Sequence, residues 1–143
     1  MIDRNAQALV VAVAAVDPAG SFCLQPANGV THCNEAARFM CAALGVPLVN
    51  DLANKQRDWL AASTEWMPVD AETARGRAES GFPTLAVWKN PTGGHGHIAL
   101  LVPAPLTNPG HIYVAAAGAS NTNSAPIERQ FGLSLTPEFF THE

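Results

Sequence analysis

The chain begins with an apolar stretch that has a helical pattern. Residues 8–16 read ALVVAVAAV, and Val10, Val11, Ala14 and Ala15 recur at helical spacing. We therefore expect a first helix that packs through these residues and ends at the Pro and Gly of residues 17–20.

The same stretch has the composition of a signal-peptide core. It is too short to cross a membrane, which takes about 20 apolar residues. The preceding segment balances Arg4 with Asp3, whereas a secretory leader begins with net positive charge. A packed helix is the preferred interpretation, so we expect no conventional export signal.

A second helix is predicted over residues 31–44. Gly45 supplies a left-handed cap and Pro47 follows just beyond it. The spacing predicts one buried face, made of Cys33, Ala37, Met40, Cys41 and Leu44.

Two more helices are expected, over residues 51–62 and 70–80, the latter capped by Asp70. After Gly81 the pattern changes to short β-branched and apolar runs separated by turns. Strands are expected over residues 84–88, 96–102, 111–117 and 127–131, while the last ten residues look peripheral. Helices followed by an antiparallel sheet predict an α+β domain.

Composition limits the possible functions. The 143 residues suit one domain, and 48% hydrophobic with 14% charged residues excludes a disordered chain or a coiled coil. Twelve Asp and Glu against eight Lys and Arg give a net charge of -4, with no basic stretch. A nucleic-acid groove or an anionic membrane patch is therefore not expected.

The three cysteines, Cys23, Cys33 and Cys41, cannot pair completely. Cys33 lies in the first turn of its predicted helix, where unpaired backbone N–H groups and the helix dipole favour a thiolate nucleophile. Buried small side chains are the preferred interpretation of Cys23 and Cys41. Whether these two form a disulfide is left open.

His97 begins an apolar strand, where its imidazole can meet a helix N-terminus packed across the sheet and act as a base. His95 and His97 also form an H-x-H pair that points to one face of a strand. With a cysteine and a fourth ligand this pair would suit zinc, which is an alternative interpretation.

The polar segment 117–123 follows the next strand, and Asn121 or Ser120 could hold the tautomer of a base histidine. An ordinary polar turn is the competing interpretation. Trp59, Trp66 and Trp88 suit the core or a groove wall for peptide or sugar.

Several segments together resemble a known family. The segments Thr31–Ala36, Leu44–Leu48, Ala53–Lys55, Trp59–Leu60 and Gly96–Val102 resemble the papain-like amidases of the NlpC and CHAP type. Within that superfamily the chain is most similar to peptidoglycan amidase effectors of bacterial type VI secretion systems and to phage-type wall hydrolases. The resemblance covers roughly residues 25–132 of a single domain spanning residues 1–143.

This resemblance implies a papain-like α+β fold whose nucleophile helix packs on a small antiparallel sheet. It implies Cys33 as nucleophile and oxyanion donor and His97 as base. The family's third polar residue would fall at Ala115–Ala117, so Asn121, or else Ser120, a few residues later is the candidate for this role, with a backbone carbonyl or a water as the alternative. His95, Trp59 and Trp88 would contact substrate, and no metal or organic cofactor is implied.

The expected reaction is hydrolysis of an amide bond in wall stem peptides through a thioester. The expected enzyme is a monomer made in the bacterial cytoplasm that acts in the periplasm or wall as an antibacterial toxin. It would be delivered by a secretion system or phage lysis, with a cognate immunity protein for an effector. A non-enzymatic wall-binding module and a Cys/His acyltransferase on the same scaffold are the alternatives.

Overall fold

The computed structural model describes residues 3–143, which form five α-helices, one 3₁₀ helix and six strands. The helices are α1 (Ala6–Val16), η1 (Phe22–Leu24), α2 (Cys33–Ala43), α3 (Ala53–Ala62), α4 (Ala71–Glu79) and α5 (Glu128–Phe131). The strands are β1 (Met67–Val69), β2 (Thr84–Trp88), β3 (His97–Val102), β4 (Tyr113–Ala116), β5 (Thr122–Pro126) and β6 (Glu138–Thr141).

The strands form one sheet in the order β1-β6-β2-β3-β4-β5, and every neighbouring pair is antiparallel. The central strand β3 pairs with β2 from His97 opposite Trp88 to Leu100 opposite Leu85. Its pairing with β4 begins only at Leu100 opposite Ala115. The first residues of β3 are thus paired on the β2 side alone.

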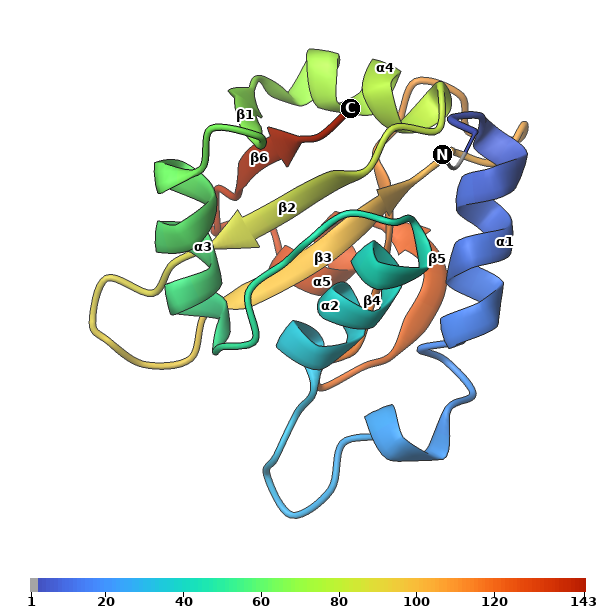
Figure 1. Ribbon diagram of the computed structural model, residues 1–143. Coiled ribbons are helices and arrows are strands. Elements are labelled where there is room, and N and C mark those ends of the chain that lie inside the picture. Colours follow the sequence, from blue (N-terminus) through green and yellow to red (C-terminus); the bar gives the residue numbers. More distant parts are fainter. Residues whose placement is uncertain (1–2) are drawn as a thin grey trace.

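Helices cover both faces of the sheet (Figure 1). The first face carries α1, α2 and α3, which pack on alternate strand residues such as Ile98 and Leu100. The opposite face carries α4 and α5, which pack on Ala99, Leu101 and Ala116. Because side chains alternate along a strand, neighbouring residues of β3 belong to different packing layers.

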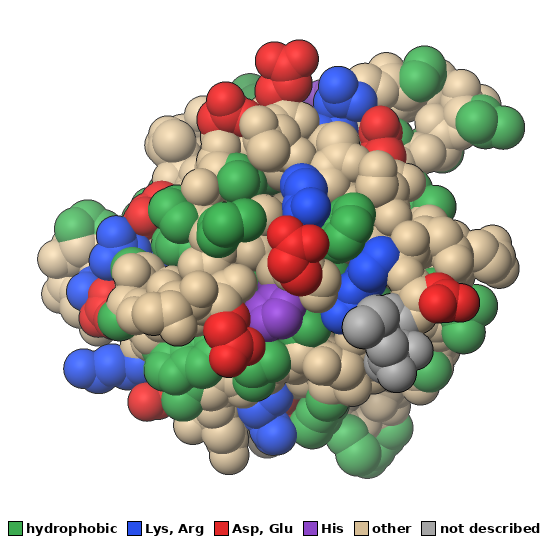
Figure 2. Space-filling model, turned by 45° about the horizontal axis from the view of Figure 1, so that its top comes forward, with side chains coloured by type: hydrophobic (Ala, Val, Ile, Leu, Met, Phe, Trp, Pro, Cys, Tyr) green, Lys and Arg blue, Asp and Glu red, His purple; other side chains and the backbone are tan. Residues whose placement is uncertain are grey.

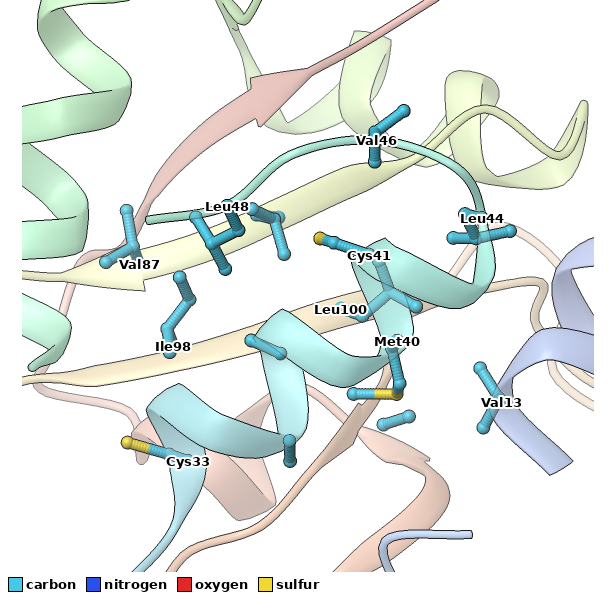
Figure 3. Packing of buried hydrophobic residues seen from close by; sticks show 14 of the residues in the cluster. Val13, Cys33, Met40, Cys41, Leu44, Val46, Leu48, Val87, Ile98 and Leu100 are labelled. Carbon is cyan, nitrogen blue, oxygen red and sulfur yellow. The ribbon is translucent and has the colours of Figure 1, made fainter. Parts of the chain in front are cut away.

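Helix α2 is the centre of the larger layer. Its Cys33, Ala37, Met40 and Cys41, together with Leu44, are buried, which confirms the predicted face. Figure 3 shows Cys41 inside this cluster between α2 and the sheet, whereas Cys33 lies at the edge of the cluster in the first turn.

The α+β prediction is confirmed, and most helix and strand positions agree with the pattern. Asp70 caps α4, since its carboxylate accepts the backbone N–H of Thr73 at 2.8 Å. Two predictions at the end of the chain are wrong. Residues 128–131 form the helix α5 and not a strand. Residues 138–141 form β6, which inserts between β1 and β2 and buries Phe140, so the chain end is not peripheral.

The buried face of the first helix differs from the prediction. Leu9, Ala12 and Val13 pack into the core, whereas Val10 and Val11 are 46% and 56% exposed. The segment is apolar on all sides, so spacing alone did not select between two apolar faces. Within residues 3–143, no helix has the length and apolar character needed to span a bilayer.

Candidate active site

Cys33 lies where α2 begins, immediately after the N-cap residue His32. Its side chain is 7% exposed and lines a cleft of about 630 Å³, which we call the Cys33 pocket. Backbone N–H groups of Cys33, Asn34 and Ile98 act on its sulfur. The Cys33 sulfur, at the start of α2, therefore lies close to the β3 backbone at Ile98, the residue that follows His97.

The sulfur is nevertheless not a resting thiolate. Burial raises the pKa of the Cys33 thiol, and this effect outweighs the three backbone N–H groups that lower it. The negative charge of Glu35 raises this pKa further. The helix N-terminus thus favours the thiolate as expected, but desolvation by burial is the larger effect on the pKa.

His97 is held by a residue that the sequence analysis did not single out. Its Nε2 lies 2.8 Å from Oε1 of Gln130, in α5, and its ring packs against Phe131 with centroids 4.9 Å apart. Gly118 lies close beside the ring, where a Cβ atom would come within 3.1 Å of Cε1. These three residues fix the position of the imidazole.

The orientation of Gln130 selects the tautomer of His97. The Gln130 amide donates from its Nε2 to the Ser120 carbonyl oxygen at 2.9 Å, so its Oε1 faces the imidazole. An oxygen there can only accept, so the proton of neutral His97 sits on Nε2. The Nδ1 lone pair is then free to take a proton.

Burial lowers the pKa of His97, and the hydrogen bond that His97 donates to Gln130 opposes this shift only in part. A neutral imidazole is the form that can act as a base. The site at rest therefore contains a neutral thiol and a neutral imidazole, and not an ion pair.

Cys33 and His97 lie in two adjoining pockets. His97 lines a second cleft of about 330 Å³, here called the His97 pocket. Both pockets share a rim made of Gly29, Thr31, His95 and Gly96. Among residues 3–143 no hydrogen bond joins Sγ to the imidazole. Strand alternation explains this, because α2 covers the face of Ile98 and His97 points toward α5.

Among residues 3–143, Asn121 forms no hydrogen bond to His97, contrary to the prediction. Its amide accepts the N–H of Gly118 at 2.9 Å and donates to the carbonyl oxygens of Pro18 and Leu24 at 3.0 and 2.7 Å. Asn121 therefore fastens the loop before α2 to the end of β4. Gln130 takes the orienting position, and nothing in the spacing of the chain indicated a partner 33 residues from His97.

The two tryptophans predicted to contact substrate lie elsewhere. Trp59 lines a separate hollow with Pro47 and Glu65, and Trp88 packs on the sheet face that carries α4 and α5. Neither lines the Cys33 pocket or the His97 pocket. His95 is exposed on the shared rim, as a substrate contact would require.

Asn54 shapes one wall of the Cys33 pocket. Its side chain donates to the Gly94 carbonyl oxygen at 2.8 Å and accepts the Asn90 backbone N–H at 2.9 Å. Gly96 permits this contact, because a Cβ there would lie 2.3 Å from Oδ1 of Asn54. The loop between β2 and β3 is thus fastened to the start of α3.

In residues 3–143, no three or more His, Cys, Asp or Glu side chains gather where they could hold a metal ion. The zinc alternative therefore lacks a ligand set in the described part of the chain. No protein-family model and no curated protein matches the sequence.

Proposed function

We propose that the chain is a papain-like cysteine hydrolase of the NlpC and CHAP type, with Cys33 as nucleophile and His97 as general base. The observation that carries this proposal is the placement of Cys33. Its sulfur sits at a helix start, in the wall of the larger cleft, with three backbone N–H groups directed at it. Reactive cysteines in hydrolases occupy this kind of environment.

The reaction follows from the neutral resting pair. As Sγ forms a bond to the amide carbonyl carbon, its proton passes to Nδ1 of His97. The carbonyl oxygen becomes an oxyanion, and backbone N–H groups at the start of α2, including that of Cys33, stabilise it. His97 then protonates the leaving amine as the C–N bond breaks. Water, deprotonated by His97, hydrolyses the thioester, and the proton returns to sulfur.

This sequence requires the Nδ1 edge of His97 to close on Sγ when substrate fills the two pockets. In support of this, the Ile98 N–H that lowers the pKa of the Cys33 thiol belongs to the residue after His97. Hydrogen bonds between catalytic groups often tighten only in the substrate complex. Gln130 supports the role of His97 as base because its bond to Nε2 leaves Nδ1 unprotonated.

The proposed substrate is the stem peptide of bacterial peptidoglycan, cut at an amide bond in the periplasm or wall. Delivery by a secretion system or at phage lysis, and a cognate immunity protein that covers the cleft, belong to the same proposal. The resemblance of the segments around Cys33 and His97 supports this choice of substrate.

Digestion of purified Gram-negative peptidoglycan tests the function directly. Wild type, Cys33→Ala, His97→Gln and Cys23→Ala would be incubated with the wall, and soluble products read by mass spectrometry. We expect new muropeptides from wild type and from Cys23→Ala, whose cysteine is exposed outside both pockets. We expect none from the other two variants.

Two outcomes would contradict the hydrolase. Folded wild type that releases nothing would favour a binding module, provided that it sediments with the wall. Products that carry an added amine in place of a new carboxyl group would identify an acyltransferase instead.

A further inference from the structure

The two pockets differ in charge from the rest of the chain. The whole protein has twelve acidic and eight basic residues, for a net charge of -4. Within residues 3–143, the linings of the Cys33 pocket and the His97 pocket contain no carboxylate. They do contain Lys55, Arg129 and the imidazoles of His95 and His97.

Most basic side chains outside the two pockets are paired with carboxylates, Arg4 and Arg38 being the exceptions among residues 3–143. Arg57, Arg75, Arg77 and Lys89 each lie within 4 Å of a carboxylate oxygen. On the face shown in Figure 2, acidic and basic side chains are intermixed. In the described residues, Lys55 and Arg129 form no such pair, and each lies in a pocket.

The two cations come from opposite sides of the sheet. Lys55 belongs to α3, which packs on the same face as α2, and Arg129 belongs to α5 on the other face. The shared rim and the start of β3 lie between them. A ligand that spans both pockets would therefore meet one positive charge in each pocket, with Cys33 in the wall of the Cys33 pocket.

The carboxylate that acts on Cys33 is already engaged. Glu35 raises the pKa of the thiol, but its Oε1 lies 2.8 Å from Nδ1 of His32 and it lines neither pocket. It therefore does not compete for the two pocket cations.

We infer that the two pockets together take an anionic peptide, with one carboxylate bound by Lys55 in the Cys33 pocket and a second by Arg129 in the His97 pocket. The cleavage of the bound peptide by Cys33 rests on the proposed function, whereas the binding of its carboxylates does not. Arg129 can hold a carboxylate through two parallel N–H donors, whereas Lys55 offers a flexible point charge.

Alkylation of Cys33 tests the charge of the cleft without any turnover. In a Cys23→Ser background, second-order rate constants would be measured for iodoacetate, which is anionic, and for iodoacetamide, which is neutral. The ratio of the two constants cancels the thiolate fraction, because both reagents use the same thiolate. A small free thiol provides the reference ratio.

We expect the wild-type ratio to exceed the reference and to fall by about twofold to fivefold for each of Lys55→Gln and Arg129→Gln. Arg38→Gln is the matched control, since it removes one positive charge from a residue that has no carboxylate partner in the described part of the chain and lines neither pocket. Its ratio should stay at the wild-type value. Added salt should lower the wild-type ratio toward the reference.

Two results would overturn the inference: a wild-type ratio equal to the reference, or a loss in Arg38→Gln as large as in the pocket variants. Either result could coexist with muropeptide release, which would leave the hydrolase standing. A raised ratio without muropeptide release would keep the anion site and remove the wall substrate. With muropeptides as substrate, amidation of their carboxylates should raise KM more than it lowers kcat.

Discussion

Nε2 of His97 and Oε1 of Gln130 lie 2.8 Å apart, at the contact between the start of β3 and the short helix α5. Nε2 of the same Gln130 amide donates to the Ser120 carbonyl oxygen at 2.9 Å, so a flipped amide would lose both hydrogen bonds. The two hydrogen bonds that link Ser120, Gln130 and His97 therefore set both the position of the imidazole ring and its tautomer. A proton-accepting role for Nδ1 depends on these two bonds.

Replacing Gln130 should impair His97 without unfolding the protein. We expect Gln130→Leu to reduce muropeptide release about 10-fold to 100-fold, a part of what a general base contributes. Nitrogen-15 NMR of histidine-labelled protein should show Nε2–H in wild type and a mixture of tautomers in the variant. Gln7→Leu, at an exposed position on α1, is the control. An unchanged tautomer in Gln130→Leu would contradict this role.

The titration of His97 should begin at lower pH than that of an ordinary histidine. Burial lowers its pKa from 6.5, and the Gln130 oxygen, which stabilises the protonated ring, opposes that shift. We therefore expect an NMR midpoint below 6.5 in wild type and lower still in Gln130→Leu. Activity should persist below pH 6.5 and fall only as His97 is protonated.

The same shift affects stability. Between the unfolded and folded pKa values of His97, the unfolded chain binds the proton and the folded chain does not. The free energy of unfolding should therefore fall as pH drops below 6.5, and less so in His97→Gln. Urea titrations at pH 7 and pH 5 measure this difference. A midpoint above 6.5 by NMR, or equal pH dependence in both proteins, would contradict the expectation.

Local patterns predicted the elements better than they predicted the site. The start of α2, the cap at Asp70 and strand 84–88 depend on nearby residues, and these predictions agree with the structure. The partner of His97 depends on where α5 packs, which no local pattern contains. The predicted substrate contacts of the tryptophans are not supported for the same reason, because strand register decides which sheet face Trp88 occupies.

The state of Cys33 could not be predicted from its place on the helix either. Its position at an N-terminus favours a thiolate, but the depth of its burial depends on α3 and β3, which pack over the same turn. Similarly, the apolar first helix offered two equivalent faces, and only the tertiary fold selected Leu9 and Val13 over Val10 and Val11.

Alkylation of Cys33 should show the raised pKa. We expect its rate with iodoacetamide in a Cys23→Ser background to keep increasing above pH 9, where a simple thiol with a pKa of about 8.5 levels off. Cys41, fully buried with a pKa raised to about 12, should stay unmodified in the folded protein. Mass spectrometry of digested samples separates the two sites. A plateau below pH 8 for Cys33 would instead indicate a preformed thiolate.

Two glycine substitutions of the same kind should have opposite effects. In Gly96→Ala the new Cβ would lie 2.3 Å from Oδ1 of Asn54 and 2.6 Å from the Trp88 carbonyl oxygen, so the wall of the Cys33 pocket must shift. We expect a loss of about 1–3 kcal/mol in the free energy of unfolding, typical of overpacking.

Gly76 provides the matched control. It lies exposed inside α4, and a Cβ there would have no heavy atom within 4 Å. Gly76→Ala should therefore stabilise the protein by roughly 0.5–1 kcal/mol, because alanine loses less backbone entropy in a helix. Urea unfolding with unchanged m-values measures both effects. If Gly96→Ala were as stable as wild type, Asn54 would be free to move, and the loop before His97 would not be fastened to α3.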